Sequence, residues 1–75
     1  MSTQKILSEV AGSIWKIETA AGQRIAAGQS IIIIESMKME IPVEAPVDGV
    51  ITTILVDEGQ AVSEGQALAI IEPAV

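Results

Sequence analysis

One short segment of this 75-residue chain combines residue types that could support covalent chemistry: Glu35-Ser36-Met37-Lys38-Met39-Glu40. Lys38 is the only basic residue between Arg24 and the C-terminus. A lysine ε-amine is the nucleophile that forms an amide with an activated carboxylate. An ordinary lysine amine is mostly protonated at neutral pH, so it does not acylate itself. We therefore predict that Lys38 is a passive acceptor, which a separate enzyme must acylate.

Two methionines flank this lysine symmetrically. In an extended strand, Met37 and Met39 would both point to the face opposite Lys38. Methionines often fill gaps in a core, but large apolar side chains at a loop tip more often form a recognition surface. The segment also lacks Gly, Asn and Asp, which a two-residue hairpin turn normally requires. The absence of these residues indicates that a requirement other than turn formation has determined the sequence of the hairpin.

An internal repeat places this segment between two similar halves of the chain. A shift of 37 residues superimposes residues of about 10–36 on about 47–73 without a gap. The matched positions are Val10 with Val47, Gly12 with Gly49, Ile14 with Ile51, Ile17 with Ile54, Gly22-Gln23 with Gly59-Gln60, Gly28-Gln29 with Gly65-Gln66, Ile33-Ile34 with Ile70-Ile71, and Glu35 with Glu72. Two copies that are each too small to bury an apolar face should pack on one another.

The local pattern within each half is that of short strands separated by glycine turns. Residues 13–18 mix apolar and polar side chains, as a half-buried strand does. Residues 31–34 are all isoleucine, which favours a strand over a helix. Pro42 and Pro46 exclude a helix interior between them. We predict a single all-β domain over residues 1–75, a flattened barrel or sandwich with approximate two-fold symmetry, in which Lys38 and the C-terminus lie at opposite ends.

The composition excludes several classes of function. The chain has no Cys and no His, and its acidic residues show no spacing typical of an acid–base pair or a metal cage, so we predict neither catalytic residues nor a metal site. A net charge of −6 disfavours nucleic-acid binding. No apolar run is long enough for a membrane span, and the N-terminus lacks a signal-peptide pattern, so we expect a cytoplasmic protein without a membrane partner. Trp15, the only aromatic residue, should lie in the core or cover it half exposed.

The segment around Lys38 resembles the attachment site of biotinyl domains in the biotin carboxyl carrier family. Glu35-Ser36-Met37-Lys38-Met39 is similar to that family's motif, (A/E)-(S/A/T)-M-K-M. Ala45-Pro46-Val47-Asp48-Gly49 resembles its A-P-x-x-G motif, and residues 58–62 and 64–68 resemble its closing turn and last strand. The resemblance extends from about Val10 to Glu72.

This resemblance implies a flattened eight-stranded β-barrel, the barrel-sandwich hybrid of biotinyl and lipoyl domains. It implies that a biotin protein ligase attaches biotin to Lys38. It also implies that neighbouring residues serve recognition by the ligase and other partners; these residues are Glu35, Ser36, Met37, Met39 and Glu40. The tethered biotin would carry a carboxyl group from biotin carboxylase to carboxyltransferase in a biotin-dependent carboxylase such as acetyl-CoA carboxylase. The chain is then a non-catalytic carrier, expected to be monomeric when isolated.

The sequence departs from some members of that family in two respects. The ungapped repeat leaves no room for the protruding thumb that some acetyl-CoA carboxylase carriers have in the first half. The chain also begins almost at the domain, without the Pro/Ala-rich linker that usually precedes those carriers. Met1 favours a free-standing carrier over a fragment of a larger enzyme.

Four alternatives remain open at the level of the sequence. A lipoyl domain shares the fold and uses a lysine at the same hairpin, but lipoyl domains resemble a D-K-A or D-K-V pattern without paired methionines. A protein that accepts both biotin and lipoate is compatible with the shared fold. An unmodified β-interaction module would leave Met37 and Met39 unexplained. An independent enzyme would need His, Cys or paired acidic residues for catalysis, and the sequence does not offer them.

Overall fold

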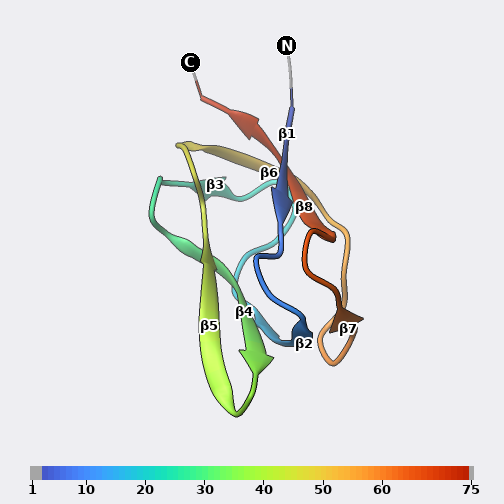
Figure 1. The fold of residues 1–75 in the computed structure, drawn as a ribbon. Helices are drawn as coiled ribbons and strands as arrows, with labels where there is room; N and C mark the ends of the chain where they lie inside the picture. The colour runs from blue at the N-terminus through green and yellow to red at the C-terminus, as the bar shows by residue number, and fades with distance from the viewer. Residues whose placement is uncertain (1–2, 75) are drawn as a thin grey trace.

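Eight short β-strands make up the regular structure of residues 3–74, the part of the chain that the computed structural model describes (Figure 1). In chain order they are β1 (Gln4–Leu7), β2 (Gly12–Ile17), β3 (Arg24–Ile25), β4 (Ser30–Ser36), β5 (Met39–Glu44), β6 (Gly49–Ile54), β7 (Ala61–Val62) and β8 (Ala67–Pro73). This described part contains no helix, and so no helical segment that could cross a membrane. The all-β prediction is confirmed.

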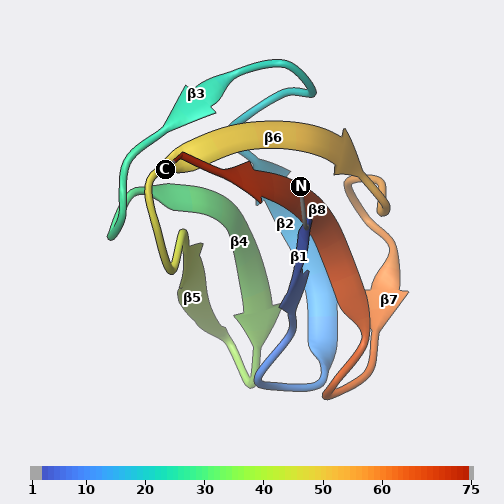
Figure 2. The same cartoon turned by 90° about the horizontal axis from the view of Figure 1, so that it is seen from above.

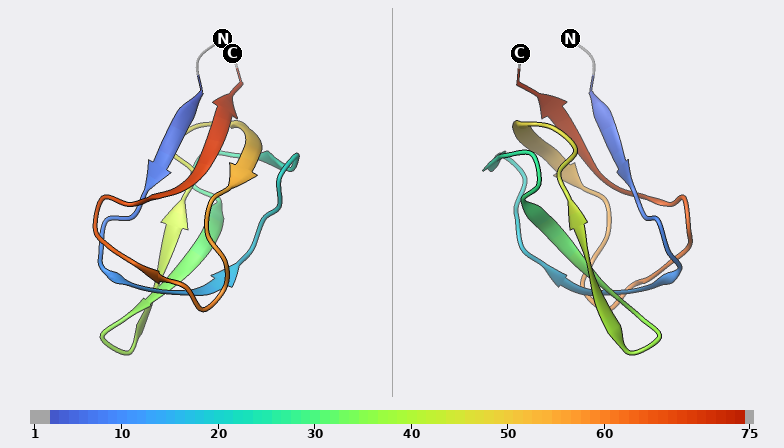
Figure 3. Two further views of the ribbon diagram at one scale, coloured as in Figure 1. Left: turned by 90° about the vertical axis from the view of Figure 1, so that its right-hand side faces the viewer. Right: turned by 60° about the vertical axis from the view of Figure 1, so that its left-hand side comes forward.

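The strands form two four-stranded antiparallel sheets with the core between them (Figures 2 and 3). One sheet has the order β1-β8-β6-β3 and is called the terminal sheet below, because it holds the first and last strands. The other has the order β5-β4-β2-β7 and is called the hairpin sheet. Each sheet takes two strands from each half of the sequence, so the two halves are interleaved in both sheets.

The 37-residue repeat relates the strands of the two halves position by position. The bounds of β2, β3 and β4 become those of β6, β7 and β8 after the shift. The equivalence also reaches β1 and β5, outside the predicted repeat, since Gln4 pairs with Ile71 as Ile41 pairs with Ile34. The loops between equivalent strands have equal lengths, so neither half carries an insertion relative to the other. This agrees with the expectation of a fold without a thumb.

Aliphatic side chains from equivalent strands form the core. Ile32 and Ile34 of β4, like Ala69 and Ile71 of β8, have no exposed surface. Burying one such isoleucine contributes about 2 kcal/mol to stability. Trp15 is 47% exposed and lies outside this core, so it half covers the sheet instead of filling the interior.

Glycine–glutamine turns connect the short strands. In residues 20–23, Gly22 has φ of +88°, as the third residue of a type II turn requires. The Gln23 amide donates to the Ala20 carbonyl (3.0 Å), and the Gln23 side-chain oxygen accepts from the Ala20 amide (3.1 Å). Three further turns repeat this arrangement, with Gly28-Gln29, Gly59-Gln60 and Gly65-Gln66. The glutamine side chain is thus part of each turn.

The β4–β5 hairpin and the chain termini lie at opposite ends of an elongated molecule of 37 × 17 × 17 Å (Figure 1). The two-fold repeat explains this placement. The shift of 37 residues carries Met37, in the hairpin turn, onto Ala74, at the last described position of the chain. A tether at either terminus therefore leaves the hairpin free to project.

Candidate functional site

The segment singled out in the sequence forms the tip of the β4–β5 hairpin. Strand pairing continues to Ser36 opposite Met39, and Met37 and Lys38 alone make the turn. Ile34 and Ile41, deeper in the same hairpin, pair with each other, and Ile34 is fully buried in the core. The tip is therefore a short extension of a rigid, well-anchored ribbon.

Both turn residues adopt left-handed backbone conformations. Met37 has φ of +52° and Lys38 has φ of +64°. These are the two positive φ values of a type I′ turn, for which Asn-Gly is the favoured pair. The left-handed conformation destabilises a non-glycine residue by roughly 1–2 kcal/mol. The idea that Met37, Lys38 and Met39 alternate along an extended strand is therefore wrong for the first two, since the turn has already begun at Met37.

The turn exposes its apolar side chains almost completely. Met37 is 92% exposed and Met39 is 64% exposed, and Lys38 between them is exposed as well. These methionines do not fill gaps in the core. Two flexible apolar side chains around one amine form a surface that a protein partner can cover.

A pair of like charges lies at the base of the turn. Glu35 on β4 is directly opposite Glu40 on β5, and both are exposed. Directly opposed like charges destabilise an antiparallel sheet. The hairpin therefore departs from local stability rules twice, in its turn residues and in this pair. Such departures are expected where function determines the sequence.

Ser36 fixes the hairpin to the residue that precedes strand β2. The Ser36 hydroxyl donates to the Ala11 carbonyl at 2.8 Å. At the equivalent place in the other half, the Ala74 amide donates to the Asp48 carbonyl at 2.8 Å. Met37 is equivalent to Ala74, but its backbone has entered the turn, and the serine side chain supplies the bond instead. The structure thus gives Ser36 an anchoring role, whereas the sequence suggested recognition.

Gly12 allows β2 to approach the last residues of β4. A Cβ atom built on Gly12 would lie 2.4 Å from the Glu35 carbonyl oxygen. Gly49, its counterpart, would place a Cβ at the same distance from the Glu72 carbonyl oxygen. The sequence matched these two glycines in the repeat but did not predict their contacts. Their agreement in register was the signal that a close backbone contact occurs twice.

We expect that replacing Met37 with asparagine stabilises the protein. Asparagine tolerates the left-handed conformation, so the free energy of unfolding should rise by about 0.5–1 kcal/mol. Met39→Asn is the matched control, because Met39 lies in a strand, where asparagine is disfavoured. Urea unfolding of the three proteins measures the difference. Equal stability of Met37→Asn and the wild type would show that the turn is not strained.

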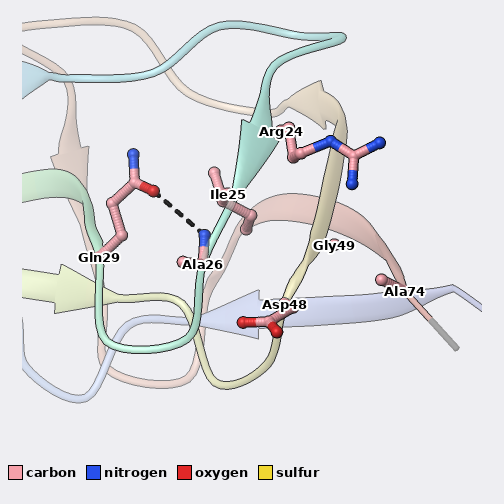
Figure 4. Close-up of a pocket in the computed structure, with 7 residues that line it drawn as sticks. All are labelled: Arg24, Ile25, Ala26, Gln29, Asp48, Gly49 and Ala74. Carbon is pink, nitrogen blue, oxygen red and sulfur yellow. Dashed lines mark hydrogen bonds between the residues drawn. The ribbon is translucent and has the colours of Figure 1, made fainter.

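Two pockets in residues 3–74 are lined by residues away from the hairpin tip. A pocket of about 400 Å³ lies at the end of the molecule that holds the C-terminal residues (Figure 4). Two of its polar side chains hold neighbouring loops: Asp48 accepts from the Ala27 amide (2.8 Å), and Gln29 accepts from the Ala26 amide (3.1 Å). Among residues 3–74, no cluster of acidic side chains could hold a metal ion. The arrangement at Lys38 can present an amine to another molecule, but it does not enclose a substrate.

The chain is similar to proteins that are named for biotin. The family model described as "Biotin-requiring enzyme" matches residues 4–71. A biotin/lipoyl attachment protein of Bacillus subtilis is 43% identical over 60 residues, which are 80% of this chain and 82% of that protein. The alpha3 subunit of a biotin-dependent acyl-coenzyme A carboxylase of Mycobacterium leprae is 37% identical over 68 residues, 91% of this chain but 11% of the subunit.

Solved structures show the same fold. The crystal structure of Kluyveromyces lactis urea carboxylase superimposes with a TM-score of 0.91 and 36% identity, over 96% of this chain and 6% of that chain. The chain therefore spans most of the Bacillus protein and a small part of each of the two carboxylase chains.

Proposed function

Since the chain belongs to the biotin/lipoyl attachment family, it is a non-catalytic carrier domain for covalently bound biotin, and we propose that Lys38 is the residue that carries it. One observation supports this assignment above all. Met37 and Lys38 are held at positive φ in an exposed turn, which a purely structural hairpin would assign to Asn-Gly. This strained turn exposes the Lys38 amine at the end of the molecule opposite the termini.

The residues around Lys38 suit an attached group of this kind. The amine is exposed at the tip, and its methionine neighbours are exposed as well, so an attached chain can leave the surface without displacing packed atoms. Biotin supplies the nitrogen that takes up and releases the carboxyl group, while the protein supplies its position. A tethered group meets a nearby active site at an effective concentration of about millimolar.

The proposed role is carboxyl transfer between two enzymes. We infer that a biotin protein ligase loads Lys38, and that biotin carboxylase and carboxyltransferase then use the loaded domain in turn. Exposed side chains at the tip would provide recognition, and these are Glu35, Met37, Met39 and Glu40. The enzyme that we propose for this carrier is a biotin-dependent carboxylase such as acetyl-CoA carboxylase. We also propose that residues 1–75 act as a single cytoplasmic domain that is monomeric in isolation.

Lipoate is the alternative cofactor, and the name of the Bacillus subtilis relative includes both groups. The paired methionines favour biotin, because Met37 stands where the D-K-A pattern has an acidic residue and Met39 stands where it has a small one. A lipoate ligase should therefore leave the mass of the unmodified protein unchanged. A full mass shift with this ligase would make the protein a carrier of both cofactors.

A carboxylation assay tests the proposed function. The domain is loaded by a biotin protein ligase, then incubated with biotin carboxylase, ATP and labelled bicarbonate. We expect label on the loaded protein and none on the unloaded protein. If the enzyme labels free biotin but not the loaded domain, the chain is not a carboxyl carrier.

A further inference from the structure

The outer face of the hairpin sheet carries apolar side chains that the core does not use. On β4, Ile32 and Ile34 face inward, so Ile33 between them faces outward. Ile33 pairs with Lys16 on β2 and with Pro42 on the edge strand β5. Trp15 precedes Lys16 and is 47% exposed. We call the side chains of Trp15, Ile33 and Pro42 the Trp15 strip.

Carboxylates lie on both sides of this strip. Toward the hairpin tip, Glu35 and Glu40 form the next outward-facing cross-strand pair. Away from the tip, Glu44 pairs with Ser30, whose hydroxyl donates to a carboxylate oxygen of Glu18 at 2.8 Å. All four glutamates are exposed. Lys16, which pairs with Ile33, adds one exposed positive charge to this face, so the four glutamates leave the frame of the apolar strip acidic on balance. Such a face complements an apolar patch surrounded mainly by Lys and Arg side chains.

The internal repeat shows that the fold does not require this strip. Trp15 is the extra residue of a β-bulge in β2, and Thr52 is the extra residue of the equivalent bulge in β6. The position equivalent to Pro42 is Lys5, on the outer edge of the terminal sheet. The same backbone thus accepts Thr and Lys at these places. Trp15 and Pro42 occupy these two positions only on the sheet that ends in the Lys38 hairpin.

We propose that the Trp15 strip is the surface through which this domain docks on biotin carboxylase, whose complementary surface is apolar and rimmed by basic side chains. This inference rests on the function proposed above. The strip and the hairpin tip belong to one sheet, so an enzyme that receives the biotin carried at the tip lies close to the strip. Half-exposed tryptophans at the centre of an interface commonly contribute much of its binding energy.

The position of the reacting atom favours the carboxylase over the ligase as the occupant. At a ligase the Lys38 amine itself reacts, so the tip must enter the enzyme and makes the contact there. At the carboxylase the reacting nitrogen lies at the end of the lysine and biotin chains, roughly 14 Å from the backbone by ordinary bond lengths. A flexible chain of that length cannot hold the domain in place. A rigid face such as the Trp15 strip can.

The variant Trp15→Thr tests this proposal, because it installs the residue that the equivalent bulge already tolerates. Leu55→Thr is the matched control, since Leu55 is 46% exposed and hydrogen bonds to Leu68 of the terminal sheet. Both variants and the wild type are loaded with biotin, and carboxylation by biotin carboxylase is followed at increasing domain concentration. We expect KM for the Trp15→Thr domain to rise about tenfold or more, with kcat unchanged. Leu55→Thr should behave as the wild type, and the wild-type KM should rise with salt.

Other results would overturn the proposal. An unchanged KM for Trp15→Thr, with a wild-type domain that is carboxylated normally, would reject the docking surface alone. A wild-type domain that is not carboxylated would reject the proposed function. Slower loading by the ligase with a normal carboxylase KM would assign the strip to the ligase. Trp15 is the only tryptophan, so its fluorescence reports on the strip alone. A change in this fluorescence when biotin is attached to the isolated domain would show that the strip binds the cofactor and not the carboxylase. A dimer that the Trp15→Thr substitution dissociates would show that the strip binds a second copy of the chain.

Discussion

Lys38→Arg is expected to abolish biotin attachment while leaving the fold intact. Arginine keeps the positive charge and tolerates the exposed position, but its guanidinium does not act as an acyl acceptor at neutral pH. Lys5 and Lys16 remain exposed in this variant. They lie within strands, so neither has the turn geometry that presents Lys38. No biotin should therefore be transferred to the variant chain.

Intact mass after incubation with a biotin protein ligase, ATP and biotin measures this effect. Lys16→Arg is the control and should be loaded as fully as the wild type, because Lys16 lies in β2, outside the turn. Urea unfolding should show that Lys38→Arg is as stable as the wild type. Transfer of biotin to Lys38→Arg at the wild-type rate would mean that another lysine is the acceptor.

Gly12→Ala is expected to lower both stability and the rate of biotin loading. The added Cβ would lie 2.4 Å from the Glu35 carbonyl oxygen and 2.9 Å from the Ile34 side chain, so β2 and the end of β4 must separate. Overpacking of this kind typically costs about 1–3 kcal/mol, a large share of the stability of a domain this small. The displaced end of β4 leads directly into the turn. A shift of about 1 Å there should slow loading tenfold to a hundredfold.

Gly49→Ala separates the two effects, because the repeat makes the same contact at the other end of the molecule. There the added Cβ would lie 2.4 Å from the Glu72 carbonyl oxygen, far from the hairpin. Both variants should lose similar stability in urea unfolding. At a temperature where both are folded, only Gly12→Ala should be loaded slowly by the ligase. Equal loading rates would show that the Gly12 contact does not position Lys38.

The repeat made the equivalences of the fold predictable, but it did not determine the strand pairing. It related β2 to β6 and β4 to β8, and it placed Lys38 opposite the termini. Matching the positions of the two halves does not determine whether a strand pairs with a strand of its own half or of the other half. The short strands β3 and β7 pair across the halves, because each turn glycine donates its amide to the opposite half, as Gly22 does to Ile51 (2.7 Å). Such long-range bonds leave no local pattern in the sequence.

The tip of the hairpin was predictable from its residues, whereas its conformation and anchoring were not. Exposure of Met37 and Met39 followed from large apolar residues in a loop. The left-handed conformations of Met37 and Lys38 could not be predicted, because both residues normally avoid that region. The bond from Ser36 to Ala11 depends on where the turn begins. Ser36 was predicted to serve recognition, and in the structure its hydroxyl donates to the loop that precedes β2.

The most direct test of the central claim is to locate biotin on the wild-type chain. The protein is loaded by a biotin protein ligase, digested with a protease, and its peptides are sequenced by tandem mass spectrometry. We predict a single biotinyl group, on the ε-amine of Lys38 within the Met37-Lys38-Met39 tip. Biotin on Lys5 or Lys16 with an unmodified Lys38, or no biotin on any lysine, would contradict it.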